Sequence, residues 1–92
     1  MVSQVDQHLP MARPDITLRR VANEWVLFDA THGRAHVLNL TAAVIWTYCD
    51  GAHGSTAIAD AIARAVPDAV PDRLHTDIDT ALRRFADEGL LQ

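Results

Sequence analysis

The chain has 92 residues, with eight basic and twelve acidic side chains, a net charge of −4 and a sequence pI near 5.6. Domains that bind nucleic acid usually present a basic face, so this charge argues against a phosphate backbone as the partner. The single cysteine, Cys49, excludes a disulfide framework and a cysteine-rich metal site, and we expect it to be a buried apolar residue.

Residues 1–14 contain two prolines and no sustained periodicity, so we expect a flexible N-terminal arm there and one domain over residues 15–92. Alternation around Ile16 and Leu18 predicts a first strand. The run of large apolar residues over 25–28 predicts a second strand, and a polar loop joins it to a third strand over 35–40. Consecutive strands usually pair with their neighbours, so the third strand is expected at an edge of the sheet.

Three helices are predicted after the strands. Thr41 is the expected N-cap of the first helix, and Asp50 and Gly51 are expected to end it. Ser55 is the expected N-cap of the second helix, which Pro67 ends, and Pro71 opens the third. The apolar stripes of these elements predict a core that includes Leu38, Ile45, Trp46, Ile62, Leu82 and Phe85.

The order of elements indicates an α+β fold, with three N-terminal antiparallel strands followed by three helices. The last two helices are joined by a short segment that contains proline, as in a helix-turn-helix, and an antiparallel ribbon lies beside them in the sequence. The expected architecture is therefore winged-helix-turn-helix-like.

The sequence contains no pattern typical of a catalytic or cofactor site. The five histidines have no HxH, HxxxH or HExxH spacing, and there is no GxSxG, phosphate loop or GxGxxG. A chain of this size also has little room to enclose a pocket for paired carboxylates. We therefore expect a protein that is not an enzyme and has no metal and no cofactor. The sequence has no run of about 18 apolar residues and no signal-peptide pattern, so we expect a cytoplasmic location without membrane contact.

The segment LNLTAAVIW, followed by Cys49, Asp50 and Gly51, resembles the PqqD family. A Val-Leu-Phe-Asp strand before this block and a closing Glu-Gly-Leu-Leu at 88–91 resemble the same family in the expected order. The resemblance spans roughly residues 15–91, and it is especially similar to small stand-alone members, including the "HPr-rel-A system" subgroup. The first 14 residues have no counterpart in it.

The resemblance implies a RiPP recognition element, a non-catalytic module that binds the leader segment of a ribosomally made precursor peptide. Such a module presents the peptide to a modifying enzyme, such as a radical SAM enzyme, a cyclase or a leader peptidase. The leader is expected to add as a strand to the third strand and to lie against the third helix. The sequence leaves open which flank of that helix faces the peptide. Carried over to this chain, the expected peptide-binding residues are Ala35, His36, Val37 and Leu38 on the strand, with Arg73, Asp77, Ile78, Ala81, Arg84 and Phe85 on the helix.

Three further expectations accompany this hypothesis. Arg73 and Arg84 are three helical turns apart, so they could lie on one line of the third helix and meet an acidic side chain of the leader. The exposed strand edge should also allow a weak homodimer. The alternative function is a winged-helix DNA-binding regulator, which would place the third helix in the major groove. Five acidic residues against three arginines on that helix and its end argue against it.

Overall fold

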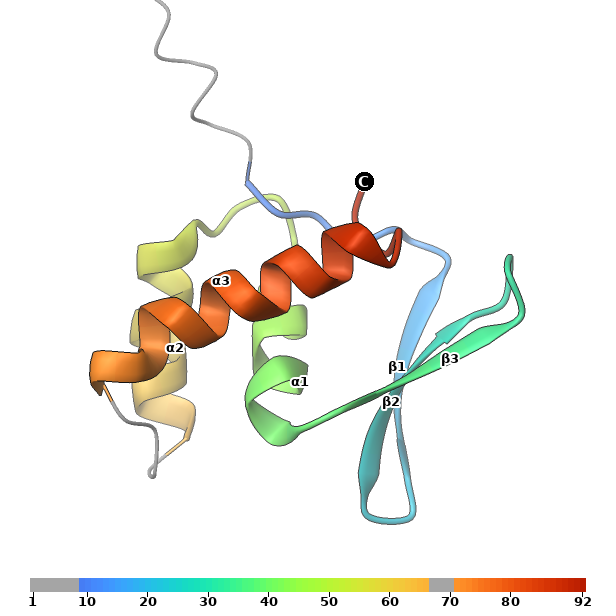
Figure 1. Ribbon diagram of the computed structural model, residues 1–92, viewed down its shortest axis with the longest axis horizontal. Coiled ribbons are helices and arrows are strands. Elements are labelled where there is room, and N and C mark those ends of the chain that lie inside the picture. The colour runs from blue at the N-terminus through green and yellow to red at the C-terminus, as the bar shows by residue number, and fades with distance from the viewer. Residues whose placement is uncertain (1–8, 67–70) are drawn as a thin grey trace, which may run out of the picture.

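A computed structural model describes residues 9–66 and 71–92 of the chain (Figure 1). Three strands are followed by three helices, as the sequence predicts, and the α+β fold is confirmed. The elements are β1 (Ile16–Val21), β2 (Glu24–Asp29), β3 (Arg34–Leu38), α1 (Leu40–Thr47), α2 (Ser55–Ala65) and α3 (Pro71–Asp87). None of the described helices is long and apolar enough to cross a membrane.

The strands form one antiparallel sheet in the order β1-β2-β3. A two-residue turn joins β1 to β2, and Ala22 in that turn has a φ of 56°. The central strand β2 pairs Leu27 with Leu18 on one side and with His36 on the other. Both β1 and β3 are therefore edge strands, and the expectation that β3 lies at an edge is confirmed.

The core lies between one face of the sheet and the three helices. Leu27, Ile45, Ile78 and Phe85 are fully buried there, and Leu90 folds back onto them after α3 ends. Trp46 packs edge-to-face on Phe85, with 5.2 Å between the ring centroids. Of the six predicted core residues, five are buried and Leu82 is only partly buried at the margin of the cluster.

The predicted helix boundaries need three corrections. The N-cap of α1 is Asn39, not Thr41, because the Asn39 Oδ1 accepts a hydrogen bond of 2.8 Å from the backbone N–H of Ala42. The helix ends at Thr47, before the predicted terminator, although Gly51 does adopt a positive φ of 79°. The N-cap of α2 is Gly54, and Ser55 is its first helical residue. The predicted role of Pro67 lies outside the described residues.

The second half of the expected N-terminal arm lies against the domain. Met11 forms an antiparallel bridge with Asp50, and Ala12 forms one with Leu91. The backbone N–H of Ala12 donates to the Cys49 carbonyl at 2.7 Å. Residues 10–13 are thus attached to the domain by main-chain hydrogen bonds. The sequence of this segment, which lacks periodicity, did not predict this attachment.

Candidate functional site

The open edge of β3 begins the candidate site. In an antiparallel ladder, the N–H and C=O of one residue point to the same side, and alternate residues point to opposite sides. The carbonyl of Val37 accepts a hydrogen bond of 3.2 Å from the Arg84 guanidinium of α3, which lies beyond the edge. The backbone N–H and C=O of Val37 therefore point away from β2, and so do those of Ala35, two residues earlier. No strand of the described residues pairs with this edge, and the Arg84 side chain reaches it at Val37.

A groove of about 230 Å³ lies next to this edge, between the start of α1 and one flank of α3. We call it the α1–α3 groove. Its floor is apolar, because Ala42, Ile45 and Ala81 are buried there. Its rim is polar, and the complete lining consists of Asn39, Thr41, Ala42, Ile45, Asp77, Thr80, Ala81 and Arg84. Such a hollow can accept an apolar side chain and place polar groups of the same ligand at the rim.

Three charged or titratable side chains, Arg84, Glu88 and His36, connect α3 to β3 beside the groove. The Arg84 Nε donates to Glu88 Oε1 at 3.1 Å, one helical turn later. The same carboxylate oxygen lies 3.4 Å from His36 Nδ1 on β3. Only 10% of the His36 side chain is exposed, and its Nε2 is buried without a hydrogen-bond partner in the described structure. These side chains fix the position of the arginine beside the strand.

The predicted strand residues occupy different sides of β3. Ala35 and Val37 are exposed, the His36 side chain is mostly buried on the helix side, and Leu38 belongs to the core. Their side chains therefore cannot act alike, and the groups that face the edge are the backbones of Ala35 and Val37.

The predicted residues of α3 separate into three groups. Asp77, Ala81 and Arg84 line the α1–α3 groove, as expected for one flank of the helix. Ile78 and Phe85 are fully buried beneath that flank. Arg73 is exposed and is not part of the groove lining, so the structure does not bring it together with Arg84.

Sequence reasoning missed Asn39, Thr41, Ala42, Thr80 and Glu88 as residues near the site. Two of them have a signal in the sequence: Thr80 is three residues from Asp77 and Glu88 is four from Arg84, so each shares a helical face with a predicted residue. The other three come from the junction of β3 and α1, and the sequence does not show that this junction faces α3.

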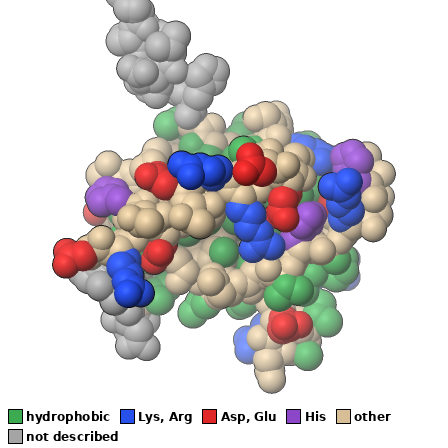
Figure 2. Space-filling view, viewed as in Figure 1, with side chains coloured by type: hydrophobic (Ala, Val, Ile, Leu, Met, Phe, Trp, Pro, Cys, Tyr) green, Lys and Arg blue, Asp and Glu red, His purple; other side chains and the backbone are tan. Residues whose placement is uncertain are grey.

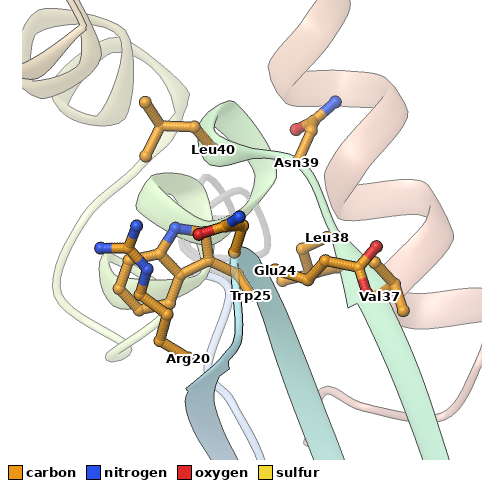
Figure 3. Close-up of a pocket in the computed structure, with 8 residues that line it drawn as sticks. Arg20, Glu24, Trp25, Val37, Leu38, Asn39 and Leu40 are labelled. Atoms are coloured by element: carbon orange, nitrogen blue, oxygen red, sulfur yellow. The ribbon is translucent and has the colours of Figure 1, made fainter.

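A second hollow of about 570 Å³ lies at the end of the sheet, on the other side of the segment 38–40 (Figure 3). Trp25 and Leu40 lie along it, and the Arg20 guanidinium lies 5.6 Å from the centroid of the Trp25 ring. This hollow is lined by the end of β1, the β1–β2 turn, the start of β2 and residues 37–40, and it shares only Asn39 with the lining of the α1–α3 groove. We therefore separate it from the α1–α3 groove, although it is the larger of the two.

The groups with shifted pKa values lie away from the groove. Burial raises the pKa of the Cys49 thiol to about 12, and the neighbouring charge of Asp50 acts in the same direction. Burial alone would also raise the pKa of the Asp29 carboxyl, but hydrogen bonds from the His32 side chain and backbone, with the charge of Arg13, leave it below its usual value. A neutral buried thiol and a paired carboxylate are structural groups, and neither offers a reactive centre.

The charges on the surface over α3 are of both signs. Figure 2 shows arginines and carboxylates interspersed on this face, with histidines between them. Within residues 9–66 and 71–92, no three His, Cys, Asp or Glu side chains are grouped as they would be around a metal ion.

Comparison with known proteins identifies the family. The model for coenzyme PQQ synthesis protein D (PqqD) matches residues 24–91, which is most of the chain and includes β2, β3 and all three helices. A search of curated protein sequences finds no significant match.

Two solved structures have a similar fold. One is TbiB1 in complex with the TbiA(beta) leader peptide, with a TM-score of 0.71 and 21% identity over 89% of this chain and 94% of the other. The second is lasso peptide synthetase B1 complexed with the leader peptide, with a TM-score of 0.71 and 22% identity over 88% and 94%. The family model and the shared fold agree with the sequence motif around α1, and the chain belongs to the PqqD family.

Proposed function

We propose that this protein is a leader-peptide-binding module, a RiPP recognition element, which captures a precursor peptide by strand addition to β3. The observation that carries the proposal is the open edge of β3, where the backbones of Ala35 and Val37 face outward beside the α1–α3 groove. Edge strands of monomeric domains are usually blunted, because free N–H and C=O groups attract other chains. An accessible edge next to a groove is the arrangement that strand-adding peptide receptors use.

The comparisons support this proposal. The two solved structures with the same fold are both complexes with leader peptides. Membership in a family that is named for coenzyme PQQ synthesis also supports a role in biosynthesis.

The geometry suggests how the peptide is recognised. Backbone hydrogen bonds to Ala35 and Val37 would give affinity with little dependence on sequence. Side chains of an added strand alternate between its two faces, so every second one would point toward α3. One of these would enter the α1–α3 groove, where Ile45 forms an apolar floor and Asp77 lies at the rim. The predicted flank of α3, with Asp77, Ala81 and Arg84, is thus the flank that we assign to the peptide.

The composition of the groove favours a role in presenting a peptide to an enzyme. The groove holds no arrangement of nucleophile, base and orienting group, so we infer a non-catalytic module that brings its peptide to a modifying enzyme. A radical SAM enzyme, a cyclase or a leader peptidase would fit this role. DNA binding by α3 has less support, because Asp72, Asp77 and Asp79 are exposed on that helix and would repel phosphates.

Chemical-shift mapping tests the proposal. The protein, labelled with nitrogen-15, is titrated with a synthetic peptide of about 20 residues from the N-terminal part of a short precursor encoded beside its gene. We expect the largest amide shifts at Ala35–Leu38, at Asn39–Ala42 and along Asp77–Arg84. A peptide of the same composition in scrambled order is the control. Shifts concentrated at residues 20–25, or the same response to the scrambled peptide, would contradict the assignment.

A further inference from the structure

The hydrogen bond between Arg84 and Val37 occupies the edge that the proposed function needs. The Arg84 Nη2 donates to the Val37 carbonyl at 3.2 Å. That carbonyl is the acceptor that an added strand would use, because Val37 faces the open side of β3. A carbonyl oxygen has two lone pairs, but the guanidinium and an amide of the peptide would both approach it from the open side of β3, so we expect them to compete there.

The arginine is held in this position from a second direction. Glu88 accepts from the Arg84 Nε at 3.1 Å and lies beside His36 of β3. The guanidinium is thus fixed between a carboxylate and a backbone carbonyl, which are the two acceptors that orient it across the gap from α3 to β3. About 40% of the Arg84 side chain remains exposed, so it has room to rotate toward solvent or toward a ligand.

We propose that Arg84 is a specificity-determining gate on the β3 edge. When a strand adds, its amide replaces the guanidinium at the Val37 carbonyl, and the released guanidinium needs a new acceptor. A peptide with a carboxylate near this point supplies one, and a charge-assisted pair of this kind is stronger than a neutral hydrogen bond. A strand without a carboxylate leaves the guanidinium with only Glu88 and water, so the gate disfavours it.

The second copy of this chain is a strand of the disfavoured kind. Residues 35–38 are Ala, His, Val and Leu, and none of them carries a carboxylate. The gate should therefore protect the free protein from edge-to-edge pairing, which is a known hazard of exposed strands. This consequence does not depend on leader binding, and it can be tested with the protein alone.

The first experiment compares the self-association of Arg84→Ala and Arg83→Ala with that of the unmodified protein by sedimentation velocity. Both substitutions remove one positive charge from a chain of net charge −4, and Arg83 is an exposed neighbour that does not line the groove. We expect Arg84→Ala to dimerise with a dissociation constant lower by roughly fivefold or more, and Arg83→Ala to remain unchanged. The Glu88→Gln variant keeps the arginine but weakens its contact with residue 88. Its dissociation constant for the dimer should lie between those of the two arginine variants.

Hydrogen exchange shows whether the dimer uses the edge. In the Arg84→Ala dimer, the amides of Ala35 and Val37 should exchange several times more slowly than in the monomer. Equal association of the Arg84 and Arg83 variants, or a dimer without this protection, would refute the proposal that Arg84 gates the β3 edge. If Arg84→Ala is poorly folded by circular dichroism, Glu88→Gln provides the same comparison.

The second experiment rests on the proposed function and uses calorimetry with the precursor peptide described above. A version of that peptide has every Asp and Glu replaced by Asn and Gln. We expect this version to bind the unmodified protein at least tenfold more weakly, but to lose less than threefold with Arg84→Ala. Equal losses for both proteins would refute the carboxylate preference. Absence of binding by either peptide would instead count against leader binding. The self-association experiment would then decide whether Arg84 gates the β3 edge.

Discussion

β1 and β3 are the two outer strands of one sheet, and both have backbone groups with which no other strand of the described residues pairs. The edge of β1 carries the consecutive arginines Arg19 and Arg20, which are exposed and belong to the strand itself. The edge of β3 is covered at Val37 by Arg84, which comes from α3. Charged residues within an edge strand discourage pairing permanently, whereas a side chain from another element can move away. We infer from this contrast that the β1 edge stays closed, whereas the β3 edge can open for a ligand.

Two leucine-to-alanine substitutions test how firmly each edge strand is anchored in the core, and we expect them to have the largest effect on stability. Leu38 of β3 is 3% exposed, whereas Leu18 of β1 is only partly buried. Replacing Leu38 with Ala should lower the free energy of unfolding by about 2–5 kcal/mol, because it leaves a cavity among packed side chains. Leu18→Ala should cost roughly half as much, since less surface returns to water. Urea denaturation of both variants provides the measurement, and equal losses would show that the two strands are anchored alike.

A pair of proline substitutions tests which edge receives the peptide. Ala35→Pro removes an N–H that faces the open side of β3, without loss of a large side chain. It should weaken binding of the precursor peptide by about tenfold or more, because one backbone hydrogen bond is lost and the ring hinders the approach.

The matched control is Arg20→Pro. Arg20 pairs with Trp25 across the ladder and faces the outer side of β1, so this change should leave peptide affinity within about twofold. Calorimetry and circular dichroism of both variants separate lost binding from lost folding. Equal loss with the two variants would mean that the β1 edge takes part.

Replacement of Asp29 tests whether its buried carboxylate stabilises the sheet to which both edge strands belong. Asp29 pairs with Ile16 of β1 and with Arg34 of β3, and its buried carboxylate accepts from Arg13 and His32. Its pKa in the folded protein lies below the ordinary value of 3.8. Its contribution to stability is therefore complete above about pH 4 and disappears as the pH falls through the lowered pKa.

Asp29→Asn should accordingly lower the urea midpoint at pH 7 by less than Leu38→Ala does. The difference between Asp29→Asn and the unmodified protein should shrink below pH 4. Midpoints measured from pH 7 to pH 3 check this. A difference that persists unchanged at pH 3 would show that the carboxylate charge is not the cause.

The smallest expected effect concerns the edge that we consider closed. The guanidinium of Arg20 lies 5.6 Å from the Trp25 ring centroid at the surface. Arg20→Ala should cost about 0.5–1 kcal/mol of stability, which is typical of an exposed cation–π contact. Peptide affinity should not change, in contrast to the Arg84 variant. A loss of affinity with Arg20→Ala would indicate that the Trp25 hollow belongs to the peptide site.

Much of this fold could be predicted from the sequence, because period-2 and helical apolar patterns mark each element and its buried face. The caps were harder to predict. Asn39 and Thr41 are both good N-cap residues, and only the observed hydrogen bond to the Ala42 amide decides between them. Main-chain bridges such as that of Ala12 with Leu91 have no side-chain signal, so the attachment of residues 10–13 could not be read from the pattern.

On α3, the family resemblance implied Asp77, Ala81 and Arg84 as peptide-binding residues, and the structure places these three in the lining of one groove, while their role stays a prediction. Arg73 shows the limit of that reasoning. Spacing gives the face of a helix, but it does not give how far along the helix the neighbouring strand extends. The contact of Arg84 with the Val37 carbonyl depends on how two distant elements pack together, so no local pattern could show it.

The bridge between Ala12 and Leu91 brings the two ends of the described domain together. The Gln92 N–H also donates to the Met11 carbonyl at 2.8 Å, so a chain that enters at Met11 leaves at almost the same point. A domain with adjacent ends can be inserted into a surface loop of a host protein without stretching the host. Inserted in this way into a peptide-modifying enzyme, it would hold a captured substrate at high effective concentration beside the catalytic centre.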